Sequence, residues 1–150
     1  MLEYTVSARR TGPPALATGD RCPSAVLALD TDPAGRTDAF NPAELLLASV
    51  AACMLKGIER VIPLLKFRLE GATVCVHGVR QDAPPRMTRI DYDLVIDTDE
   101  SDQRLDLLHQ NVRKFGTIYN TVSAAVELTG RIRRGAVGGV SDLTRKTAAG

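Results

Sequence analysis

The sequence is poor in the residue types from which many functional sites are built. It contains no tryptophan, three tyrosines, three phenylalanines, two histidines and three cysteines among 150 residues, and its net charge is +1. A nearly neutral chain with few aromatic residues lacks the positive charge and the stacking surfaces on which nucleic-acid binding depends. The histidines and cysteines match no zinc spacing, and three cysteines do not make a framework of disulfides. We therefore predict reduced thiols, no metal, no other cofactor and no nucleic-acid partner.

Long hydrophobic runs are also missing. The N-terminus lacks the charged and then apolar segments of a signal peptide. The longest apolar run, residues 43–55, contains Glu44 and is too short to cross a bilayer. These absences predict a cytoplasmic protein with no membrane partner. Its 25% charged and 44% hydrophobic residues are typical of a globular chain, and 150 residues suffice for one domain with a sizeable core.

The apolar pattern predicts strands, a long helix, a pair of strands, a second helix and a last strand. Alternating residues predict the strands, and a period of 3.6 predicts the helices. This order indicates an α+β domain over residues 1–134, with helices on one side of an antiparallel sheet. Residues 135–150 are small and polar, and we expect a disordered tail there. The predicted strands are residues 2–8, 24–29, 72–77, 90–97 and 126–132, and the predicted helices are residues 42–66 and 102–115.

The long helix carries the most informative segment. Asn41 can cap its first turn, and Glu44 stands where the acid of a capping box reaches back. The helix is apolar around much of its circumference, so it needs a second apolar surface besides the sheet; we infer a homodimer that buries it between subunits. Cys53 follows among small residues. A thiol in this position is either inert packing or a redox centre with restricted access.

Residues 41–53 read Asn-Pro-Ala-Glu-Leu-Leu-Leu-Ala-Ser-Val-Ala-Ala-Cys, which resembles the signature helix of the OsmC/Ohr family. These are the osmotically inducible and organic-hydroperoxide-resistance proteins. The resemblance continues through residues 84–90, Pro-Pro-Arg-Met-Thr-Arg-Ile, and residues 118–123, Ile-Tyr-Asn-Thr-Val-Ser. It implies an OsmC-like fold: an intertwined α+β homodimer, with an antiparallel sheet packed on a long central helix. The peroxidase members of the OsmC/Ohr family reduce organic hydroperoxides with a reactive cysteine, a resolving cysteine and an Arg/Glu pair that activates the reactive thiol.

The resemblance also implies roles for individual residues. The reactive cysteine corresponds to Cys53, whose thiolate would attack the peroxide O–O bond and become a sulfenic acid. Where the resolving cysteine would precede the Ile-Tyr-Asn-Thr segment, this chain has Gly116, so an external thiol would have to resolve the intermediate.

The activating pair is less well matched. Arg36, in the loop before the long helix, corresponds to the arginine of one subfamily, whereas Pro14 stands at the place that another subfamily uses. Glu44 would orient Arg36, although many members carry the acid one position earlier, at Ala43. Nine residues separate Glu44 from Cys53, and in an unbroken helix that spacing puts them on opposite faces.

Two functions stay open at the level of sequence. The first is an OsmC-like, thiol-dependent peroxidase of the oxidative stress response, which reduces organic hydroperoxides or hydrogen peroxide through Cys53 with an external thiol or dithiol as reductant. The alternative is a catalytically degenerate dimer of the same fold that binds a small apolar ligand or a partner in the stress response. For the peroxidase, the predicted substrate-binding residues are Leu46, Leu47, Val50, Met54, Phe115 and Tyr119.

Other polar residues have simpler interpretations. Cys75 and His77 share one face of a predicted strand, but two ligands without a second pair favour a surface thiol and a surface imidazole over a metal site. His109 is expected to be exposed on the second helix. The arginines near the C-terminus are interpreted as a solvated face; they are Arg131, Arg133 and Arg134.

Overall fold

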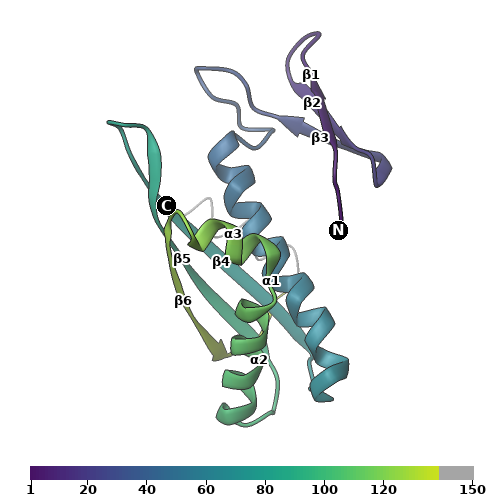
Figure 1. Cartoon of the computed structure of the whole chain (residues 1–150), viewed down its shortest axis with the longest axis vertical. Helices are drawn as coiled ribbons and strands as arrows, with labels where there is room; N and C mark the ends of the chain where they lie inside the picture. Colours follow the sequence, from purple (N-terminus) through teal and green to yellow (C-terminus); the bar gives the residue numbers. More distant parts are fainter. Residues whose placement is uncertain (139–150) are drawn as a thin grey trace. The chain divides into compact units, whose positions relative to one another are not determined.

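A computed structural model describes residues 1–138 as six strands and three helices in two compact units (Figure 1). Unit 1 comprises Met1–Leu46, and unit 2 comprises the described residues from Leu47 onward, so the boundary falls inside the first helix. Most of the predicted tail, residues 139–150, lies outside the described residues. Within residues 1–138, no helix has the length and apolar character needed to cross a membrane.

Unit 1 contains a three-stranded antiparallel sheet in the order β1-β2-β3. The strands are β1 (Val6–Arg9), β2 (Ala15–Gly19) and β3 (Cys22–Leu29). The sequence did not predict β2, because Ala-Leu-Ala-Thr-Gly is short and offers mostly small side chains; its Ala15 and Ala17 are nevertheless buried. The alternating apolar residues that predicted a strand at residues 2–8 are not buried in this chain, since all four residues of β1 are exposed.

The long helix α1 spans Pro42–Leu65, as predicted. Its first turn is closed by the predicted capping box: Asn41 N–H donates to Glu44 Oε2, and Glu44 N–H donates to Asn41 Oδ1, both at 2.9 Å. The helix ends where Arg104 donates to the carbonyl of Leu65. Its buried residues recur every three or four positions and so form one face; they are Val50, Met54, Gly57, Ile58 and Val61.

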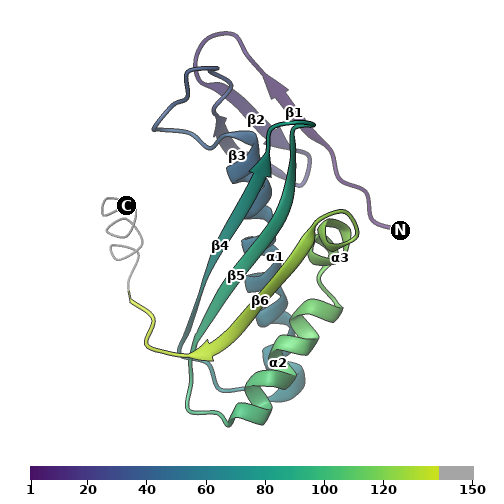
Figure 2. The ribbon, with the colours of Figure 1, turned by 90° about the vertical axis from the view of Figure 1, so that its left-hand side faces the viewer.

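Unit 2 contains a second three-stranded sheet, in the order β4-β5-β6. β4 (Gly71–Gln81) and β5 (Arg86–Asp97) form the predicted antiparallel hairpin. β6 (Glu127–Arg134) pairs with β5 in parallel, so the prediction of an antiparallel sheet is wrong for this pairing. The physical reason is the connection, which passes through two helices before it returns to the sheet in the same direction (Figure 2).

The two connecting helices are α2 (Asp102–Lys114) and α3 (Thr117–Ser123). Ser101 caps α2, accepting a hydrogen bond from Arg104 N–H at 3.3 Å. The sequence did not predict α3 as a helix. Gly116 follows the last turn of α2, where a glycine often ends a helix in the left-handed conformation, but its φ is −79°, and it is the N-cap of α3. A left-handed backbone at the end of α2 therefore does not account for the glycine at position 116.

One face of the second sheet carries the core of unit 2. Alternate residues of β5 and β6 face α2, whose buried residues lie at helical spacing. α1 approaches α2 closely at Gly57, where an added Cβ would lie 3.3 Å from a side-chain atom of Val112. The core includes Ile90, Tyr92, Leu94, Ile96, Leu105, Leu108, Val112 and Leu128.

Candidate functional site

Cys53 lies on α1 beside the junction of α2 and α3, and its side chain is partly exposed. A Cβ built on Gly116 would lie 3.3 Å from Cys53 Sγ. It would also lie 3.0 Å from Val112 O and 3.0 Å from Tyr119 Cβ. Glycine at position 116 thus lets the junction approach the thiol, which explains the residue better than helix termination does.

A basic residue that the sequence analysis missed lies near this junction. Arg60 Nη1 donates to the carbonyl of Phe115 at 3.2 Å, and its Cζ lies 5.3 Å from the Phe115 ring centroid. Lys114 Nζ lies 5.2 Å from the same centroid. Arg60 follows Cys53 by seven residues, so the two share a helix face, and this spacing was a signal available in the sequence. Positive charge is therefore concentrated around Phe115, beside Gly116.

The predicted substrate-binding residues differ in accessibility. Val50 is 0% exposed and Met54 1% exposed, so in this chain they can form only the floor of a site. Phe115 is 49% exposed and Tyr119 is half-buried, as expected for residues at an opening. Leu46 and Leu47 are half-buried at the boundary of the two units.

Arg36 and Glu44 belong to unit 1, whereas Cys53 belongs to unit 2. Arg36 donates through Nε and Nη2 to the two carboxylate oxygens of Asp38, both at 2.8 Å. This hydrogen-bonded ion pair raises the pKa of Arg36 and lowers the pKa of Asp38. Glu44 is engaged in the capping box. Both predicted activating side chains therefore have partners within unit 1.

A hydrogen-bonded pair that the sequence did not predict lies behind Tyr119. The hydroxyl of Tyr92 is 2.6 Å from Nε2 of His109, and the Tyr92 ring meets those of His109 and Tyr119 edge to face. Burial raises the pKa of Tyr92 to about 12. Burial, and then the charge of Arg113, lower the pKa of His109. At neutral pH the phenol therefore donates to a neutral imidazole, and the pair supports the Tyr119 side of the thiol site.

The prediction that His109 is exposed is therefore wrong. The sequence contained the signal, because residues 105, 108, 109 and 112 follow the i, i+3, i+4, i+7 pattern of a buried helix face. His109 was predicted to be exposed because it lies one position past the Leu108 contact. The tyrosine that satisfies it comes from β5, and that pairing is set by the tertiary structure.

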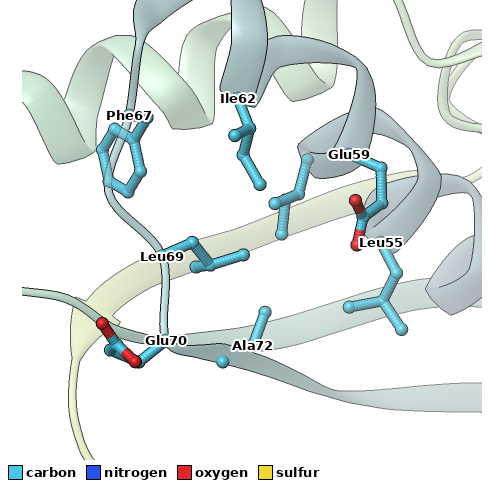
Figure 3. A pocket seen from close by; sticks show the side chains of 9 residues that line it. Leu55, Glu59, Ile62, Phe67, Leu69, Glu70 and Ala72 are labelled. Carbon is cyan, nitrogen blue, oxygen red and sulfur yellow. The ribbon is translucent and has the colours of Figure 1, made fainter.

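A separate hollow of about 540 Å³ lies between the second half of α1 and the start of β4 (Figure 3). Most of the lining residues are apolar, but the lining surface is about half polar, and two carboxylates, Glu59 and Glu70, lie at its edge. Cys53 is not among the lining residues. Those residues are Leu55, Ile58, Glu59, Ile62, Phe67, Leu69, Glu70, Gly71 and Ala72.

The family model described as OsmC-like protein matches residues 35–130 of this chain. No curated protein sequence matches this chain significantly.

Solved structures share the fold. An OsmC-like protein from Mycoplasma pneumoniae is 19% identical with a TM-score of 0.80, over 90% of this chain and 99% of that one. An organic hydroperoxide resistance protein OsmC from Legionella pneumophila is 17% identical with a TM-score of 0.66, over 88% and 97%. The organic hydroperoxide resistance protein OhrB of Bacillus subtilis is 20% identical with a TM-score of 0.61, over 88% and 98%. These similarities confirm the predicted α+β, OsmC-like fold.

Proposed function

This chain belongs to the OsmC-like protein family, and from that membership we propose that it is a thiol-dependent peroxidase with Cys53 as its single reactive cysteine. The observation that carries the proposal is the partly exposed Cys53 thiol beside Gly116, at a junction flanked by aromatic side chains and basic residues. Relatives of the same fold are named organic hydroperoxide resistance proteins. The proposed substrates are organic hydroperoxides or hydrogen peroxide.

In the proposed reaction, the Cys53 thiolate attacks the terminal oxygen of the hydroperoxide. A new S–O bond forms, the O–O bond breaks, and the alkoxide leaves and takes a proton to become an alcohol. Because position 116 is glycine, an external thiol condenses with the Cys53 sulfenic acid and releases water. A second external thiol then exchanges with the mixed disulfide and returns Cys53 to its reduced form.

The apolar floor formed by Val50 and Met54, with Phe115 at the opening, favours an alkyl hydroperoxide over hydrogen peroxide. Arg36 is proposed as the activator of the thiolate and Glu44 as its orienting acid. The proposal also includes a cytoplasmic location and a homodimer. Leu55 and Leu64 on α1 support the homodimer, since they are 37% and 75% exposed and would be covered by a partner.

Near-stoichiometric cumene hydroperoxide is expected to add one oxygen to the wild-type chain within seconds and none to Cys53→Ala. Hydrogen peroxide should react more slowly, because it gains nothing from the apolar floor. Intact-mass analysis of the reduced proteins measures both rates. Retention of the added oxygen until an external thiol is supplied would identify a one-cysteine enzyme.

A chain with no Cys53-dependent oxidation over minutes would contradict the peroxidase and favour the second candidate, a dimer of this fold that binds a small apolar ligand without turnover. The observation behind that candidate is the hollow of about 540 Å³ beside α1, which is lined mostly by apolar residues and is large enough for a small molecule. Native mass spectrometry of the purified protein would then show a retained hydrophobic molecule.

If Arg36 activates the thiolate, Arg36→Gln should slow Cys53 oxidation at pH 7 by about 25-fold. A cation that lowers a thiol pKa by about two units from about 8.5 raises the thiolate fraction at pH 7 from about 3% to about 75%. Asp38→Asn is the matched control: it removes the ion pair at 2.8 Å and should leave the rate equal or higher. Stopped-flow reaction with cumene hydroperoxide gives both rates. Unchanged rates in both variants would exclude Arg36 and direct attention to Arg60, which lies on the Cys53 face of α1.

A further inference from the structure

The outer face of the β4–β5–β6 sheet, which points away from the core of unit 2, contains a second thiol. Cys75 on β4 lies directly opposite Asp93 on β5, and His77 lies opposite Asp91. Asp93 is in turn paired with Arg131 on β6. These side chains surround a hollow of about 340 Å³, and Cys75 and His77 are both exposed at its edge. All of them lie in unit 2, on the strands that Figure 2 labels β4, β5 and β6.

His77 is exposed beside Cys75 on the outer face of β4. Its Nδ1 is 3.3 Å from Asp91 Oδ1, which orients the ring and leaves Nε2 for a second partner. Cys75 precedes His77 by two residues on the same strand face, a separation of about 7 Å between Cα atoms. The thiol and the imidazole can therefore meet directly or through one water. Thiol, imidazole and carboxylate together are the groups that activate a cysteine nucleophile.

The charges around Cys75 favour an anionic partner. Arg131 Nε and Arg133 Nη2 lie 2.9 and 3.0 Å from the carboxylate of Asp93, and these arginines, Arg133 first, lower its pKa. Arg89 Nε lies 3.5 Å from Asp91 Oδ1. Asp93 faces two guanidinium groups, those of Arg131 and Arg133, so its end of the hollow has one positive charge in excess. At the other end, Arg89 lies near Asp91 and opposite Glu127 of β6. Arg131 is also 73% exposed, so it can meet a carboxylate that arrives from solvent.

We propose that this hollow is a thiol-exchange site, at which Cys75 forms a mixed disulfide with small disulfides that carry carboxylates. The Cys75 thiol passes its proton to His77, and the thiolate attacks one sulfur of the small disulfide. The new S–S bond joins Cys75 to half of that molecule, and the old S–S bond breaks. The departing thiolate takes the proton from His77 and leaves as a thiol. The small disulfide is the oxidant, and Arg131 binds its carboxylate.

The test compares two single-thiol chains, because Cys22 is also an exposed free cysteine and lies in the other sheet. The chain's two histidines are in unit 2, so Cys22 has no imidazole in its own unit. The Cys75 chain carries Cys22→Ser and Cys53→Ala, and the Cys22 chain carries Cys53→Ala and Cys75→Ser. Each is mixed with 5,5′-dithiobis(2-nitrobenzoate), an anionic disulfide, and with neutral 2,2′-dithiodipyridine, and release of the leaving thiol is followed by absorbance. Because Cys53 is absent from both chains, the result does not depend on the peroxidase.

Cys75 should react with the anionic disulfide about tenfold faster than Cys22, and this advantage should shrink in 0.5 M salt, which screens exposed charges beyond about 4 Å. Within the Cys75 chain, His77→Gln should lower the rates with both reagents by about tenfold, since it removes the proton acceptor. Arg131→Gln should lower the rate with the anionic reagent alone. Equal reaction rates for Cys75 and Cys22, or rates for Cys75 that His77→Gln leaves unchanged, would show that Cys75 is an ordinary surface thiol and would overturn the proposal.

Discussion

A cysteine placed at position 116 is expected to form a disulfide with Cys53 after one equivalent of peroxide. The geometry is favourable, because a Cβ at this position would lie 3.3 Å from Cys53 Sγ, and the distance from Cβ to the far sulfur of a disulfide is about 3 Å. Gly116 has a φ of −79°, which any L-residue adopts without strain. Gly116→Cys would therefore trap the Cys53 sulfenic acid within the chain, as a resolving cysteine does.

The signature of this disulfide is a mass change. The wild type gains one oxygen, whereas oxidised Gly116→Cys should lose two hydrogens relative to its reduced form and block labelling of two thiols. Gly116→Ser is the matched control, since it introduces the same crowding against Val112 O and Tyr119, both 3.0 Å from the new Cβ, without a second sulfur. Each reduced variant should lose about 1–2 kcal/mol of stability through this crowding. A Gly116→Cys chain that keeps the added oxygen would contradict the proposed proximity of the two positions in solution.

The elements with strong periodicity could be predicted from the sequence. The helix at Pro42–Leu65 and the hairpin of β4 and β5 were found because their apolar residues repeat over many positions. The strand β2 and the helix α3 were missed, since five and seven residues give too few repeats to reveal a period. The parallel pairing of β6 with β5 follows from the helical crossover between them, and the predicted helix at residues 102–115 already supplied such a crossover. The antiparallel prediction did not take this crossover into account.

The candidate site could be predicted only in part. A resemblance assigned the proposed reactive cysteine to Cys53 and the place of a resolving cysteine to Gly116, but the approach of the two positions joins residues far apart in sequence. Periodicity explains neither Arg60 at the carbonyl of Phe115 nor the hydrogen bond between Tyr92 and His109, because each pairs a side chain with a separate element. Local patterns therefore found the helix that carries the thiol and missed most of what surrounds it.

Gly130→Ala is expected to destabilise the protein by about 3 kcal/mol, which is at the upper end of what overpacking costs. The cost is this high because the new methyl group would also strain the hydrogen bond between Tyr92 and His109. A Cβ on Gly130 would lie 2.5 Å from two atoms of the Tyr92 ring and 2.6 Å from a third, closer than side chains tolerate. The ring cannot simply move aside, since its hydroxyl is held 2.6 Å from His109 Nε2. Urea denaturation measures the change in the free energy of unfolding.

Gly12→Ala provides the control, because a Cβ on Gly12 would have no atom within 4 Å, and its stability should change by less than about 1 kcal/mol. The decisive variant combines Gly130→Ala with Tyr92→Ala, which removes the obstructing ring; the added cost of the glycine change should then largely disappear. Equal losses of stability with and without the Tyr92 ring would refute the crowding argument.

Tyr92 meets Tyr119 edge to face, and Tyr119 flanks Gly116 beside Cys53. Gly130→Ala should therefore also slow Cys53 oxidation, in molecules that are still folded, because the side of the site behind Tyr119 is displaced.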